Sequence, residues 1–161
     1  MDRISFIAQR ENSAMSFFRQ GCNCSQAVLL AFSDVLGLDE LTIKKVGSGL
    51  GGGMGRMREV CGTVSAMAII TGFLSPAADP ADMKARKANY NLVQTLAEEF
   101  RKKNGSIVCR ELLGLRSAGA QSPEPAERTA EYYAARPCER LVGDSAGIIA
   151  GWIFDNNFLK P

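Results

Sequence analysis

The chain has 161 residues, of which 46% are hydrophobic and 22% charged, a composition typical of one compact globular domain with a sizeable core. It contains no histidine, which excludes Ser-His-Asp and Cys-His hydrolases, HExxH metalloproteases, Cys₂His₂ zinc fingers and histidine-ligated haem. Lys and Arg number 19 and Asp and Glu 17, and the resulting charge of +2 is too balanced for a protein that binds nucleic acid or a membrane surface.

Helical patterns dominate the chain, because apolar residues recur at three- and four-residue spacing and alternating β-branched runs are almost absent. The first patterns predict helices over 3–19, closed by Gly21, and over 25–36, closed by Gly37. A short helix is expected to open near Asp39.

The second half continues in the same way, with helices predicted over 57–74, 79–103 and 138–154. A stretch rich in Ser, Pro and Gly over 117–126 predicts a loop on the surface. No internal repeat or linker divides the chain. We therefore expect an all-α, single-domain helical bundle over residues 1–161, with a glycine-rich loop.

The helix over 79–103 has the clearest signals at both ends. Asp79 is the expected cap, Pro80 suits the first helical position, and Asn104-Gly105 is a stop signal. Its predicted buried stripe consists of Met83, Tyr90, Val93, Leu96, Ala97 and Phe100.

The longest uncharged stretch, over 60–78, has the length of a membrane span but contains several Gly, Ser and Thr residues and a proline. We expect it to form a buried core helix. The first ten residues carry charges of both signs and have no sustained apolar region, unlike a secretory signal. The predicted location is therefore the cytoplasm.

The chain has five cysteines, Cys22, Cys24, Cys61, Cys109 and Cys138. In a reducing cytoplasm a disulfide framework is disfavoured, whereas metal binding or redox chemistry is favoured. No two cysteines form a Cys-x-x-Cys pair, so neither a thioredoxin-type dithiol nor a local zinc motif is present. A thiol site would have to be assembled by the tertiary fold.

All of these cysteines except Cys22 lie near a predicted helix start. A helix N-terminus carries partial positive charge and unpaired N–H groups, which favour a thiolate or a bound sulfur. Arginines add positive charge close by in sequence, namely Arg58, Arg110, Arg136 and Arg140. The alternative is that the cysteines serve as small buried hydrophobic residues.

Six of the nine residues over 47–55 are glycines. Neither a Walker ending nor a Gly-x-Gly-x-x-Gly opened by a strand is present, so the run gives little support for nucleotide binding. It favours either close helix packing or backbone contact with a cofactor. The candidate cofactor-binding residues are Gly51, Gly52, Gly53 and Arg58.

Five segments taken together resemble a known family: Asn23-Cys24-Ser25-Gln26-Ala27-Val28, Gly49 to Gly55, Cys61-Gly62-Thr63-Val64-Ser65, Cys109-Arg110-Glu111-Leu112-Leu113-Gly114, and a late Cys138. This set resembles the redox-linked family named for its spaced cysteines, C_GCAxxG_C_C, over roughly residues 15–143. The resemblance implies a small helical protein suspected of redox or metal chemistry, with Cys24, Cys61, Cys109 and Cys138 as the family's cysteines. The sequence departs from the family pattern at Thr63, where Ala is usual, and at Ala66, where Gly is usual.

The leading hypothesis is an electron-transfer module in which Cys24, Cys61, Cys109 and Cys138 hold an iron–sulfur cluster. We prefer iron–sulfur to zinc because glycine N–H groups and arginines beside the ligands are means of tuning a potential. A structural zinc on four cysteines, a thiol/disulfide oxidoreductase without metal, and a structural bundle with buried thiols remain alternatives. Whether the protein is an enzyme stays open, and so do a redox partner protein and a homo-oligomer as its partners.

Overall fold

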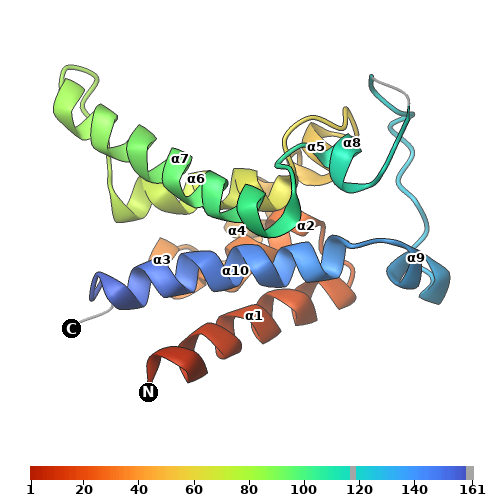
Figure 1. Cartoon of the computed structure of the whole chain (residues 1–161), viewed down its shortest axis with the longest axis horizontal. Helices are drawn as coiled ribbons and strands as arrows, with labels where there is room; N and C mark the ends of the chain where they lie inside the picture. The colour runs from red at the N-terminus through yellow and green to blue at the C-terminus, as the bar shows by residue number, and fades with distance from the viewer. Residues whose placement is uncertain (117–118, 159–161) are drawn as a thin grey trace.

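The computed structural model describes residues 1–116 and 119–158. Helices α1 (Arg3–Arg19) and α10 (Cys138–Asp155) lie side by side and run in opposite directions, so the start of α1 and the end of α10 lie at the same end of the pair (Figure 1). Three glycines of α10, Gly143, Gly147 and Gly151, lie against α1, where an added Cβ would come within 2.2 to 3.1 Å of an α1 side chain. These glycines let the two helices approach closely.

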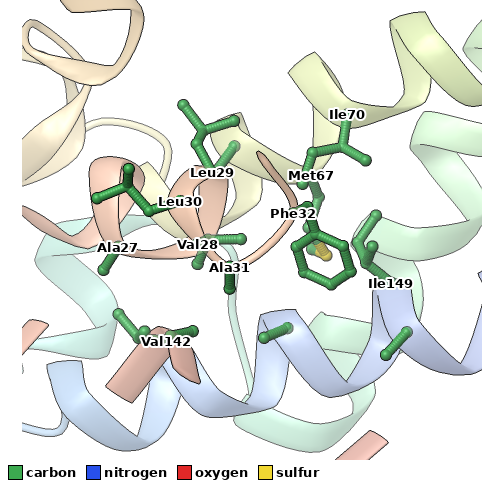
Figure 2. Packing of buried hydrophobic residues seen from close by; sticks show 14 of the residues in the cluster. Ala27, Val28, Leu29, Leu30, Ala31, Phe32, Met67, Ile70, Val142 and Ile149 are labelled. Carbon is green, nitrogen blue, oxygen red and sulfur yellow. The ribbon is translucent and has the colours of Figure 1, made fainter. Parts of the chain in front are cut away.

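The hydrophobic core lies where α1 and α10 meet α2 (Cys24–Leu30), α6 (Gly62–Leu74) and α7 (Met83–Asn104). Figure 2 shows its centre, in which Phe32 and Met67 point toward Ile149 of α10. The fold is all-α as predicted, and the only β pairing among the described residues is one isolated bridge between Val60 and Val108.

The helix predicted over 25–36 is two helices, α2 and α3 (Ser33–Leu36). They are separated by Ala31 and Phe32, and the φ of −121° and ψ of 28° of Phe32 leave the helical region. Arg10 of α1 donates a 2.5 Å hydrogen bond to the carbonyl oxygen of Ala31, which satisfies an acceptor left unpaired by the break. Gly37 ends α3 in the left-handed conformation, as its place in the sequence indicates.

Helix α4 (Glu40–Gly47) begins after the Asp39 cap and is joined to the start of α2 by side-chain hydrogen bonds. The amide nitrogen of Asn23 donates to the carbonyl oxygens of Gly47 and Ser48, and that of Gln26 donates to the carbonyl oxygen of Lys44. Asn23 and Gln26 also form a capping box at the start of α2. The position of Cys24, which follows Asn23, is thereby fixed.

The glycine run forms a left-handed turn, part of which is α5 (Gly51–Met54). All residues from Gly52 to Arg56 have positive φ, between 57° and 68°. Glycine adopts this conformation without steric cost, whereas each L-residue costs about 1–2 kcal/mol, so the glycine content of the run has a direct conformational reason.

The helix predicted over 57–74 begins later, because α6 starts at Gly62. Arg58 has a φ of +59°, which a right-handed helix does not allow, and Val60 pairs with Val108 instead. The remainder of the uncharged stretch is a largely buried helix, as expected. Within the described part of the chain, no helix is long and apolar enough to cross a membrane.

The helix predicted over 79–103 also begins later, since Asp82 rather than Asp79 is the N-cap of α7 and accepts a hydrogen bond from the backbone of Ala85. Asp79 instead accepts one from the backbone of Ala81 in the turn before it. The predicted buried stripe is wrong in part: Met83 and Tyr90 are 56% and 58% exposed. The buried residues of α7 are Leu92, Leu96 and Phe100.

Two short helices complete the chain. Helix α8 (Cys109–Leu112) starts at a predicted helix start, whereas α9 (Ala130–Ala135) is absent from the sequence-based prediction. The predicted loop 117–126 is confirmed over 119–126, where most residues are exposed and none is helical, while 117–118 lie outside the described residues. Helix α10 begins at Cys138, as predicted, and ends one residue beyond the predicted end.

Candidate functional site

The cysteines Cys24, Cys61, Cys109 and Cys138 line one cavity of about 60 Å³. This volume is several times the roughly 10–15 Å³ that one water needs. Each of the four lies at a helix start: three are the first residues of α2, α8 and α10, and Cys61 is the residue before α6. The fold thus brings together side chains that are far apart in sequence.

Cys61 and Cys109 are positioned by the isolated bridge. The backbone N–H of Cys61 donates to the carbonyl oxygen of Ile107 at 2.8 Å, and that of Cys109 donates to the carbonyl oxygen of Glu59 at 2.6 Å. These bonds flank the bridge between Val60 and Val108. A short antiparallel pairing therefore joins the two cysteine segments across nearly fifty residues of chain.

Cys24 and Cys109 each lie against a glycine. A Cβ added to Gly62 would lie 2.5 Å from the Cys24 sulfur, and one added to Gly53 would lie 2.6 Å from the Cys109 Cβ. Real Cβ atoms essentially never come this close to such atoms. These two glycines leave the space that the cysteine side chains occupy.

Burial favours the neutral form of three of the cavity thiols, Cys24, Cys61 and Cys138. Burial raises the pKa of Cys61 to about 12 and the pKa values of Cys24 and Cys138 to about 11, from an ordinary value of 9.0. Repulsion between the thiolates adds to this effect, since the charge of Cys138 raises the pKa of Cys24 and the charge of Cys61 raises that of Cys138.

Hydrogen bonds to the sulfurs act in the opposite direction and favour the thiolates. The backbone N–H of Gly52 interacts with the Cys24 sulfur and lowers the pKa of that thiol. The Thr63 hydroxyl lies 3.2 Å from the Cys61 sulfur and lowers the pKa of Cys61. Both effects are smaller than the effect of burial.

Arg58 carries a buried positive charge at the cavity wall. Its side chain is only 3% exposed, and Nη1 lies 3.5 Å from the Cys109 sulfur, to which it donates. Nε donates to the Gln121 side chain at 2.9 Å, and no carboxylate among the described residues lies within 4 Å. A buried cation without a carboxylate partner is costly, so this site favours a negative charge on or between the sulfurs.

The other predicted site residues lie at different distances from the cavity. Gly52 lines it together with Arg58, whereas Gly51 packs on Asn23 and Gly53 packs behind Cys109. Cys22 does not line the cavity, although burial raises the pKa of its thiol too.

The predicted arginines divide in the same way. Arg136 lines the cavity, whereas Arg110 pairs with Glu59 and Arg140 pairs with Asp144. Proximity in sequence to a cysteine therefore does not place an arginine at the thiols.

Tyr132 and Arg128 complete the wall, and the sequence-based prediction missed both. Two guanidinium groups lie over the Tyr132 ring, that of Arg128 at 4.8 Å and that of Arg136 at 4.7 Å from its centroid. Thr129 caps α9 by accepting a hydrogen bond from the backbone of Tyr132. This Thr, followed by Glu131, is a helix-start signal that could have identified the segment.

The donor chemistry of the cavity suits a thiophilic metal, since four sulfurs face one space with a cation beside them. All five cysteines are free. Within residues 1–116 and 119–158, however, no three Cys, Asp or Glu side chains are already arranged to hold a metal ion. Metal binding would require the thiol side chains to turn toward a common centre.

Comparison with known families assigns the chain to one of them. Residues 22–152 match the family model described as "Putative redox-active protein (C_GCAxxG_C_C)". The chain belongs to this family. The match begins later and extends further than the resemblance deduced from the motifs, and it contains the whole C_GCAxxG_C_C cysteine set together with most of α10. Neither a curated protein nor a solved structure gave a match.

The two departures from the C_GCAxxG_C_C pattern lie next to the cavity or in the core. Thr63 contributes the hydroxyl beside Cys61, and Ala66 is completely buried in α6. The Thr63 hydroxyl is a polar group directed at a sulfur, which an alanine would not supply.

Proposed function

We propose that this protein transfers electrons and that its cofactor, an iron–sulfur cluster, is held by Cys24, Cys61, Cys109 and Cys138. The observation that carries the proposal is the single cavity lined by these four thiols, beside a buried arginine with no carboxylate partner among the described residues. A bound cluster would supply one-electron transfer.

The electrostatics of the cavity favour a bound metal over free thiolates. Four thiolates would repel one another, and burial already raises the pKa of Cys61 to about 12. A cation at the centre would remove both penalties, because metal binding displaces the thiol protons and compensates the negative charges. Arg58 would then balance part of the net negative charge that a metal with four thiolate ligands carries.

The residues around the sulfurs fit the tuning of a reduction potential. Hydrogen bonds to sulfur and nearby charge are the means by which a protein sets the potential of an iron–sulfur cluster. Here Gly52 and Arg58 each direct a donor to a different cysteine, and the Thr63 hydroxyl would donate to a metal-bound Cys61 sulfur, which has no proton of its own. A purely structural zinc site does not need such donors, which is why we prefer the redox-active cluster.

Thiol/disulfide exchange without metal is the second candidate, and the free, neighbouring cysteines favour it. Exchange requires a thiolate, and thiols with pKa values near 11 or 12 are almost entirely protonated at neutral pH. Burial therefore makes Cys24, Cys61 and Cys138 slow nucleophiles, which ranks this candidate below the metal site.

Anaerobic purification followed by metal and acid-labile sulfide analysis tests the proposal. We expect iron and sulfide in comparable amounts and a visible absorption band that is bleached by dithionite. Zinc without colour would instead favour the structural site. A metal-free protein that takes up neither iron with sulfide nor zinc on reconstitution would contradict the proposal and favour the dithiol alternative.

A further inference from the structure

A second pocket lies beside the cysteine cavity and is lined by four arginines. It has a volume of about 320 Å³, in the range of small-molecule sites. Arg58, Arg128, Arg136 and Tyr132 belong to the walls of both spaces, whereas Arg56 lines only the second. We call this space the arginine pocket.

The arginine pocket has no negative charge of its own. None of the residues lining it is Asp or Glu. Among the described residues, none of its four arginines lies within 4 Å of a carboxylate, whereas Arg3, Arg10, Arg19, Arg101, Arg110 and Arg140 all do. Outside the pocket, only Arg86 and Arg116 also have no such ion pair among the described residues, so a group of four unpaired arginines is unusual for the chain.

Two of the arginines have donors to spare. The structure gives Arg136 no hydrogen-bond acceptor among the described residues, and only the Tyr132 ring holds it. Arg56 donates from Nε to the carbonyl oxygen of Ser122 and makes one long contact of 3.5 Å with Gln121, so Nη1 is unused. Each guanidinium has five N–H donors in a planar fork that suits oxyanions.

The other two arginines are fixed in place. Arg128 donates to the carbonyl oxygens of Phe18 and Cys22 and stacks on aromatic rings, and Arg58 is held by Gln121 and Cys109. The pocket therefore combines a rigid positive wall with two arginines that retain free donors. Such an arrangement orients a ligand with little loss of side-chain entropy.

Assembling these charges has a cost that a bound anion would remove. The pKa of Arg56 is lowered by burial and by the charges of Arg58 and Arg136. Arg56 also holds a left-handed backbone conformation that is unfavourable for a non-glycine residue. Strained and mutually repelling residues of this kind are concentrated at functional sites.

We propose that the arginine pocket binds a phosphate-class oxyanion carrying at least two negative charges. A tetrahedral anion offers several acceptor oxygens in different directions, which suits guanidinium groups that approach from the glycine turn and from both ends of α9. A single carboxylate would satisfy only one fork. The volume exceeds the size of one phosphate, so pyrophosphate should bind more tightly than inorganic phosphate. This inference does not depend on the proposed function.

Isothermal titration calorimetry tests it, with the protein as purified in a phosphate- and sulfate-free buffer of constant ionic strength. Inorganic phosphate, pyrophosphate and acetate are the probes. We expect saturable binding of one pyrophosphate, weaker binding of phosphate, and no binding of acetate. Acetate binding equal to that of pyrophosphate, or no binding of either phosphate probe, would overturn the proposal.

Three variants locate the site. Arg136→Gln and Arg56→Asn should each weaken pyrophosphate binding about tenfold or more, since charge-assisted hydrogen bonds are lost. Asparagine tolerates a positive φ better than most residues, which preserves the turn at position 56. Lys84→Gln removes the same charge from the exposed start of α7, at the far end of the molecule from α9 (Figure 1), and should change binding less than twofold.

Equal weakening in Lys84→Gln and Arg136→Gln would indicate only general charge attraction and would contradict the assignment. Circular dichroism shows whether each variant is folded. Cys61→Ser provides the remaining control: it should lose any metal and still bind pyrophosphate, so failure of the metal proposal and failure of this one give different results.

Discussion

Replacing Gly62 with alanine should destabilise the protein, although alanine is the better helix former. In an open helical position the change from glycine to alanine is stabilising by about 1 kcal/mol. At Gly62, however, the new Cβ would lie 2.5 Å from the Cys24 sulfur and 2.7 Å from the carbonyl oxygen of Leu50. The second contact is with backbone, which cannot move away by a simple side-chain rotation.

Overpacking costs about 1–3 kcal/mol, and two contacts under 3.0 Å, one of them with backbone, place Gly62→Ala at the upper end of this range. After the gain in helix propensity of about 1 kcal/mol, a net loss of about 2 kcal/mol remains. In a domain of this size each kcal/mol shifts the melting temperature by about 2–4 °C. We therefore expect Gly62→Ala to lower the melting temperature of the reduced, metal-free protein by roughly 4–8 °C in a calorimetric scan.

Gly72→Ala is the matched control, because Gly72 lies in the same helix and an added Cβ would meet nothing within 4 Å. This variant should raise the melting temperature by about 2–4 °C. If Gly62→Ala melts at or above the wild-type temperature, or if both variants shift in the same direction, Gly62 does not define the space occupied by the Cys24 sulfur.

Three further predictions concern the thiols and their surroundings. Raising the pH from 9 to 12 should destabilise the metal-free protein, because the folded state retains thiol protons that the unfolded chain releases. The raised pKa of Cys61, about 12 against 9.0, contributes to the free energy of unfolding, and this contribution is fully present below pH 9. Its loss by pH 12 should lower the free energy of unfolding by on the order of 4 kcal/mol in urea titrations. Cys61→Ala should show a smaller loss. Gly52→Ala and Gly37→Ala should each cost about 1–2 kcal/mol of stability, because both glycines have a positive φ. Only Gly52→Ala should also shift the reduction potential in a redox titration, or the Cys24 thiol pKa in an alkylation titration. Equal shifts in both variants would refute a specific role of the Gly52 N–H. Arg58→Gln should lower the reduction potential of a bound cluster in voltammetry, because the reduced form loses a nearby positive charge. Arg110→Gln, which removes an exposed ion pair with Glu59, should leave the potential nearly unchanged. An unchanged potential in Arg58→Gln would argue against the role of Arg58 as a counter-charge.

Local signals in the sequence predict much of this fold. The helix starts at the cysteines, the caps at Asp39 and Gly37, and the buried helix within 60–78 follow from residues close to one another in the chain. The helix over 79–103 shows the limit of such signals, since two aspartates three residues apart are both possible caps. Asp82 caps α7, whereas Asp79 accepts a hydrogen bond within the turn before it. Spacing alone predicts Tyr90 in the buried stripe, yet the buried face of α7 is set by its packing on α6 and α10, which leaves this ring exposed.

The arrangement of the site depended on contacts that no local pattern encodes. The left-handed turn over 52–56 exploits the glycines of the run, but nothing in their spacing indicates that Gly53 would lie behind Cys109. Arg58 precedes Cys61 in sequence but contacts Cys109, because the bridge between Val60 and Val108 places that cysteine closer. The arginine pocket joins the turn to α9, a helix of six residues that is too short for periodicity to detect.

The most direct test of the four-cysteine site is the metal content of single cysteine-to-serine variants, purified anaerobically in parallel. Cys24→Ser, Cys61→Ser, Cys109→Ser and Cys138→Ser should each lose most of the bound iron, because each removes one sulfur from the shared cavity. Cys22→Ser should retain the wild-type content, since Cys22 does not line that cavity. Loss of metal in Cys22→Ser together with retention in Cys24→Ser, or full retention in all four cavity variants, would contradict the account.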